Sequence, residues 1–197
     1  MKVKFFTFLC ILVTASFYGQ TRGYAGMRST QLILKNGDTL NVMGKLKSNV
    51  FKYKKDYGAK PVKIKYSEIE SIKIKLGKDD VAVFKPLPLK GTDKIIPVEE
   101  FVTGNKISLY GVTNNFMGQG AGGIRFQQTS VTYYIKKPSE ELLIKLGAYQ
   151  PIFGNLKEKL KTLFKDCDIL LKKIKNKEFR MRDGIEEMFK FYNKKCS

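Results

Sequence analysis

Two segments in the N-terminal half of the chain alternate strictly between apolar residues and lysine. In residues 62–66 and again in residues 72–76, every second side chain is apolar or aromatic and the side chains between them are lysines. A period of two places the apolar side chains on one face of a β-strand and the charged ones on the other. The pattern predicts two half-buried strands whose solvent faces carry Lys63, Lys65, Lys73 and Lys75.

A hairpin signal precedes these strands. Asn36 and Gly37 lie in the middle of an apolar-rich stretch, residues 30–42. Asn-Gly favours a tight hairpin because both turn positions accept a positive φ. Residues 67–71 read as a brief turn or a single helical turn between the two lysine-bearing strands. Residues 30–85 are therefore predicted to form a small β-meander that curls into a barrel or a half-sandwich.

The middle of the chain continues the strand pattern. Strand signals recur at residues 98–110 and 130–136, so further antiparallel strands are expected to extend the same sheet. The glycine-rich segment between them, residues 118–123, lacks the Gly-Lys-Ser/Thr ending and the strand-to-helix setting of a phosphate-binding loop. It is predicted to be a hairpin loop.

The spacing of apolar residues becomes helical near the C-terminus. One apolar stripe at spacings of three and four residues has lysines opposite it. This stripe consists of Leu156, Leu160, Leu163 and Phe164. Two shorter helices are expected to follow. Asp166 is the predicted N-cap of the first, and Asp183 with Glu186 forms the predicted capping pair of the second.

The N-terminus reads as a secretory signal peptide. Lys2 and Lys4 precede an apolar stretch at residues 5–13, and small residues then offer two cleavage points, the later one before Gln20. A retained membrane anchor is disfavoured, because residues 5–18 are fewer than the roughly 20 that a spanning helix needs. We therefore expect export, and no later segment is long and apolar enough to span a membrane.

Two cysteines remain once Cys10 is removed with the signal peptide. Cys167 and Cys196 form an even pair in a chain bound for an oxidising compartment, so a disulfide is predicted. It would close a loop of about 30 residues and stabilise the fold by roughly 3.5 kcal/mol through lost chain entropy. Two free thiols are the alternative if the chain is not exported.

Together these patterns predict an α+β fold. A β-rich N-terminal meander or barrel, extended by further antiparallel strands, is followed by a disulfide-closed C-terminal helical module. We divide the precursor into a signal peptide at residues 1–19, a β-rich domain at residues 20–154 and a helical tail at residues 155–197. After cleavage the chain is long enough for one ordinary domain, or for two small units that share a core.

The chain is strongly basic, and its charge is uneven. The formal net charge is +19, and residues 20–85 hold 15 basic against 6 acidic side chains. Of the 37 basic residues 32 are lysine. Dispersed lysine is typical of solubilising faces and of diffuse contacts with anions, whereas specific phosphate recognition favours arginine. The four strand lysines above are the candidate anion contacts, and a solvated face without a ligand is the alternative.

The composition argues against catalysis. The chain has no histidine, which removes the usual general base at neutral pH and the commonest metal ligand. Paired carboxylates are the remaining route to acid–base chemistry, and an exported hydrolase that uses them is the alternative function. These residues are Glu68, Glu70, Glu99 and Glu100. Charge balance against neighbouring lysines explains them more simply, so no catalytic residue, metal site or cofactor is predicted.

Several stretches carry a resemblance to known proteins. They include Phe-Lys-Asp-Cys at residues 164–167, residues 173–179, Phe-Tyr-Asn-Lys-Lys-Cys at residues 191–196, and residues 100–110, which contain Gly-Asn-Lys-Ile. These stretches are similar to small exported envelope proteins of Bacteroidetes-type bacteria, typically of unknown function. The resemblance implies a periplasmic or outer-envelope location, supports the disulfide and brings no catalytic residues. The glycine-rich residues 118–123 depart from the pattern.

We therefore expect an exported, non-catalytic module that binds or supports a component of the cell envelope. Its expected location is the periplasm, the outer membrane or the extracellular space. The expected partner is an anionic envelope component, such as lipid head groups, lipopolysaccharide or acidic glycan, or another envelope protein. Nucleic acid is the disfavoured alternative, and it predicts an affinity that falls steeply with salt.

Overall fold

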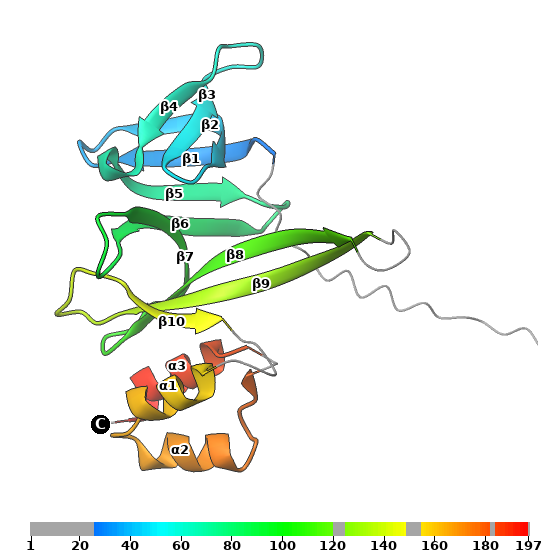
Figure 1. The fold of residues 1–197 in the computed structure, drawn as a ribbon. Coiled ribbons are helices and arrows are strands. Elements are labelled where there is room, and N and C mark those ends of the chain that lie inside the picture. The colour runs from blue at the N-terminus through cyan, green and yellow to red at the C-terminus, as the bar shows by residue number, and fades with distance from the viewer. Residues whose placement is uncertain (1–25, 120–124, 149–154, 182–183, 197) are drawn as a thin grey trace, which may run out of the picture.

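The computed structural model describes residues 26–119, 125–148, 155–181 and 184–196. The predicted signal peptide, the tip of the glycine-rich segment and Asp183 lie outside these residues. Within them the chain forms one antiparallel sheet of ten strands followed by three helices, as Figure 1 shows. The predicted α+β class is confirmed.

The first four strands form an antiparallel meander. They are β1 (Arg28–Leu34), β2 (Thr39–Leu46), β3 (Val50–Lys54) and β4 (Val62–Lys65). A single 3-10 turn, η1 (Tyr66–Glu68), then leads to β5 (Ile69–Lys75), which pairs with β1 and not with β4. The strand order departs from a simple meander here. At this point the buried Tyr66 hydroxyl donates to the Lys47 carbonyl at 2.5 Å and accepts from the Lys47 N–H at 3.2 Å, and the Lys35 N–H after β1 donates to the Glu68 carbonyl at 3.0 Å.

Five further strands continue the sheet from β5. They are β6 (Val81–Pro88), β7 (Ile95–Val102), β8 (Ser108–Gln119), β9 (Arg125–Lys136) and β10 (Ile144–Ala148). A parallel bridge between Leu89 and Leu143 joins the end of β6 to the start of β10. The Leu143 N–H donates to the Pro88 carbonyl at 2.8 Å, and the Lys90 N–H donates to the Leu143 carbonyl at 3.0 Å. Strands β6 to β10 therefore close into a ring, visible in Figure 1.

The coiled sheet encloses two apolar cores. The first lies inside the curled strands β1 to β6 and includes Leu32, Phe51, Ile72 and Phe84. The second lies inside the ring and includes Val98, Tyr110, Tyr134 and Leu143. Ile72 and Ile74 are buried while Lys73 and Lys75 are exposed, so the predicted alternation along β5 is confirmed.

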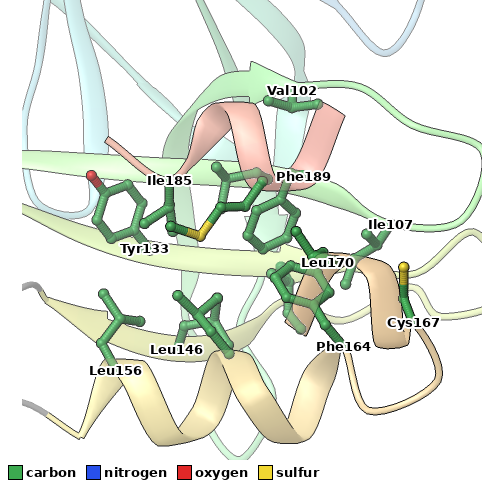
Figure 2. Packing of buried hydrophobic residues seen from close by; sticks show 14 of the residues in the cluster. Val102, Ile107, Tyr133, Leu146, Leu156, Phe164, Cys167, Leu170, Ile185 and Phe189 are labelled. Atoms are coloured by element: carbon green, nitrogen blue, oxygen red, sulfur yellow. The ribbon is translucent and has the colours of Figure 1, made fainter. Parts of the chain in front are cut away.

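The helices cover the outer face of the ring. They are α1 (Leu156–Leu163), α2 (Asp168–Lys175) and α3 (Glu186–Lys195). Figure 2 shows helix residues such as Phe164 and Phe189 packed with Tyr133 and Leu146 of the sheet, so the helices and the sheet share this third core. None of the described helices is long and apolar enough to cross a membrane.

The disulfide between Cys167 and Cys196 is confirmed, with their Cα atoms 5.4 Å apart. It joins the start of α2 to the end of α3. The predicted apolar stripe of α1 faces the core, where Leu156 and Leu160 are buried.

Two local predictions need correction. Only Gly37 of the Asn-Gly pair has a positive φ, at 93°, because the Asn36 side chain accepts from the Asp38 N–H at 3.1 Å and shapes a longer turn. Asp166 does not cap α2, whose N-cap position is Cys167. The Asp166 carboxylate instead accepts from the Tyr192 hydroxyl at 2.7 Å.

Candidate functional site

Lysines gather on the outer face of strands β2, β3 and β4. The strand register places Lys45 opposite Lys52, and Lys52 opposite Lys63. These three side chains therefore stand in a row that crosses three neighbouring strands. Lys54 and Lys65 flank the row on β3 and β4. We call the five residues Lys45, Lys52, Lys54, Lys63 and Lys65 the lysine face.

The core on the other side of the sheet fixes the direction of these lysines. Phe51 and Tyr53 are buried on the inner face of β3, so the residues that alternate with them project outward. Gly44 allows β2 to approach this core, because a Cβ atom built there would lie 2.1 Å from the Phe51 ring. Lys45, the next residue, consequently points away from the core.

The row is electrostatically unfavourable for the isolated protein. Adjacent strands lie about 4.8 Å apart, and like charges directly opposite one another destabilise a sheet. Within the described part of the chain, Lys45, Lys52 and Lys63 form no ion pair. The helices pack against the ring at the far end of the molecule and leave this face uncovered (Figure 1).

The structure divides the four lysines predicted from sequence between two regions. Lys63 and Lys65 belong to the lysine face on the edge strand β4. Lys73 lies between Gln31 and Val83 on the neighbouring strands, so it joins no lysine row. Strands β1, β2 and β3 separate β4 from β5.

Sequence reasoning missed Lys45, Lys52 and Lys54. The segment Val50–Lys54 alternates as clearly as the two segments that were recognised, and this signal was available in the sequence. The row of lysines could not be predicted from the sequence, because it depends on which strands pair and in what register.

The structure places the candidate carboxylates in different settings. Glu68 lies in η1, not in an extended strand, and its carboxylate accepts from the Lys65 N–H at 3.2 Å. Glu99 is buried on β7. Glu100 lies 2.9 Å from the amine of Lys85. Glu99, Glu100 and Glu186 line an open cavity of about 530 Å³.

Lys85 interacts with the acidic residues of this region. Burial lowers the pKa of Lys85, but the hydrogen bond to Glu100 and the charges of Glu100, Tyr110 and Glu70 raise it by more, so the net pKa lies above its usual value. Glu100 and Glu70 are therefore counter-charges to the Lys85 amine.

The turn between β7 and β8 meets the C-terminal helix α3. The Asn193 side chain of α3 accepts from the Lys106 and Ile107 N–H groups at 3.0 and 3.1 Å. The Lys106 amine donates to the Cys196 carbonyl. These contacts hold α3 and the disulfide against the turn between β7 and β8, which is a structural role.

Among the described residues, no group of three or more histidine, cysteine, aspartate or glutamate side chains is placed to hold a metal ion. The chain matches no known protein family, no curated protein and no solved structure.

Proposed function

We propose that the chain is an exported, non-catalytic module of the cell envelope that binds a linear polyanion, of lipopolysaccharide or acidic-glycan type, on the lysine face. One observation carries this proposal: the row of Lys45, Lys52 and Lys63 across three strands. An extended chain of phosphate or carboxylate groups that runs across the strands would meet one amine at each strand, at steps of about 4.8 Å.

A purely structural explanation covers only part of the lysine face. Lysines on an edge strand protect it against pairing with other chains, and this explains Lys63 and Lys65 on β4. Lys45 and Lys52 lie on β2 and β3, which are paired on both sides. Edge protection does not account for them, whereas a bound polyanion would supply the missing counter-charge.

The export part of the proposal rests on the N-terminal sequence. The charged, apolar and small-residue regions at the N-terminus have the order of a signal peptide. A Cys167–Cys196 disulfide is compatible with an oxidising compartment outside the cytoplasm. The envelope polymers named above are the abundant polyanions of that compartment.

The test compares two triple variants of equal charge. In the first, Lys45, Lys52 and Lys63 are replaced by glutamine. In the control, the exposed helix lysines Lys157, Lys172 and Lys194 are replaced by glutamine. Binding of purified lipopolysaccharide and of a polyuronate is measured by calorimetry at several salt concentrations, with a single-stranded oligonucleotide as the third ligand.

The proposal expects the wild type and the control to bind an envelope polymer with an affinity that falls with salt, and the first variant to bind about tenfold or more weakly. Equal affinities for the two triple variants would refute the lysine face as the site. Binding of the oligonucleotide alone would replace the envelope polymer with nucleic acid.

A further inference from the structure

A second lysine-rich site lies at the other end of the molecule, between the sheet and α1. An open groove of about 720 Å³ is lined by the end of β9, the start of β10 and α1. Its volume is in the range of sites that bind small molecules. Five lysines line it, namely Lys106, Lys137, Lys145, Lys159 and Lys165.

The groove combines this basic lining with apolar residues. Ile107, Ile135 and Leu146 are buried residues of the third core, and Ile144 and Leu163 pack against that core while remaining partly exposed. Ile144 and Leu163 thus give the groove a partly exposed apolar surface. The groove therefore offers an apolar body and cationic ends to a ligand.

The acidic residues in the groove already have partners. Glu158 lies 2.9 Å from the Lys161 amine, and Asp166 accepts from the Tyr192 hydroxyl. Lys106 and Lys159 donate to the backbone carbonyls of Cys196 and Leu146, which fixes these two amines in place.

Three of the lysines have their charge available to a ligand. Within the described residues, Lys137, Lys145 and Lys165 form no ion pair. Five lysines against two carboxylates leave the lining with an excess of positive charge. A neutral lipid would satisfy the apolar lining and leave this excess uncompensated.

We propose that this groove binds a single-chain amphiphilic anion, with its acyl chain against Ile144, Leu146 and Leu163 and its carboxylate or phosphate among the lysines. The shared chemistry is one acyl chain and one anionic head group, and the head group comes either from a fatty acid or from a lysophospholipid. This site is separate from the lysine face and does not depend on it.

A blocking variant tests the groove without altering the core. Thr162 is exposed on α1 and lines the groove, so T162W fills it. Lys157 is exposed on the same helix and does not line the groove, so K157W is the matched control. A second pair tests the charge, with K137E/K165E in the groove and K157E/K172E outside it.

Calorimetry of the full chain is carried out with palmitate, with palmitoyl-lysophosphatidate and with the uncharged monopalmitoylglycerol, each below its micelle-forming concentration. We expect one or both anions to bind, and the neutral lipid to bind at least about tenfold more weakly. T162W and K137E/K165E should each lose about tenfold in affinity while their controls keep it. The preferred anion identifies the source of the head group.

The proposal fails if the neutral lipid binds as tightly as the anions, if neither anion binds, or if K157W weakens binding as much as T162W. Circular dichroism of each variant shows that it is folded before its affinity is compared. Because the lysine face is unchanged in all four variants, polymer binding there should persist, so the two proposals fail independently.

Discussion

The Asn193 side chain satisfies its whole amide group with hydrogen bonds. Its oxygen accepts from two backbone N–H groups, and its nitrogen donates to the carbonyls of Ile107 and Phe189 at 2.8 and 2.9 Å. Gly104 makes room for this side chain, since a Cβ atom there would lie 2.2 Å from the Asn193 amide. One residue thus attaches α3 to the turn between β7 and β8.

Replacement of Asn193 by leucine keeps the approximate volume and removes these bonds. We expect the free energy of unfolding to fall by about 1 to 3 kcal/mol, because half-buried backbone groups lose their partners. Urea denaturation measures the change. Asn105 is exposed nearby, and N105L should cost no more than about 0.5 kcal/mol. A similar cost for both variants would show that the Asn193 bonds contribute little.

Two buried tyrosines make stability sensitive to alkaline pH. Burial raises the pKa of Tyr66 to about 12 despite the hydrogen bond to Lys47, which lowers it. Burial, assisted by the charge of Glu186, raises the pKa of Tyr133 to about 12. The folded state therefore retains these protons more strongly than the unfolded state, in which the pKa of tyrosine is about 10.

The free energy of unfolding should therefore fall as the pH rises. The contribution is fully present below about pH 10 and is lost towards pH 12. Urea denaturation at a series of alkaline pH values should show this fall, and Y66F should show a smaller one. An equal fall in Y66F and the wild type would mean that Tyr66 titrates normally.

At the scale of the elements, the lysine face carries a cost for the free protein. Lys45, Lys52 and Lys63 stand opposite one another on adjacent strands, where like charges repel. The variant with glutamine at these three positions should therefore be more stable than the wild type, by about 0.5 to 1.5 kcal/mol at low salt. The gain should shrink as salt screens the charges.

Thermal and urea unfolding at low and high salt measure this gain. The triple variant of Lys157, Lys172 and Lys194 corrects for the general effect of lower net charge. If that control gains as much stability, the row carries no special repulsion and the argument for a bound counter-charge is lost.

The elements also show how far the sequence could predict the fold. Alternation identified the buried face of β5, and the helical spacing identified Leu156 and Leu160 as core residues, because both signals are local. On the edge strand β4 the same pattern was misleading, since Val62 is 42% exposed. The pairing of β5 with β1 could not be predicted, since it joins residues far apart in the sequence, such as Leu32 with Ile72. The lysine row depends on the same pairing.

At the scale of the whole molecule, the sheet curls around two apolar cores, and the helices cover the outer face of the ring formed by β6 to β10. The helices share a core with the ring, and the disulfide connects α2 to α3 beside it. The predicted division near residue 154 therefore separates strands from helices but does not separate their cores. The contact of Asn193 with Lys106, 87 residues apart, shows why sequence spacing alone could not reveal this.

Intact mass of the native protein from cell fractions tests export together with the disulfide. We expect a chain shortened by the signal peptide, found outside the cytoplasm, that gains the mass of two hydrogen atoms on reduction. A full-length, reduced chain in the cytosol would contradict export. Nucleic acid would then be the expected polyanionic ligand of the lysine face.

The proposed binding of an envelope polyanion across β2, β3 and β4 can be followed at each residue in solution. Amide chemical shifts of the isotope-labelled protein, recorded during titration with a short polyuronate or with lipopolysaccharide-derived oligosaccharide, test it most directly. The largest shifts should fall on Lys45, Lys52, Lys63 and their strand neighbours, and they should disappear at high salt. Shifts spread evenly over all surface lysines, or confined to the helices, would contradict it.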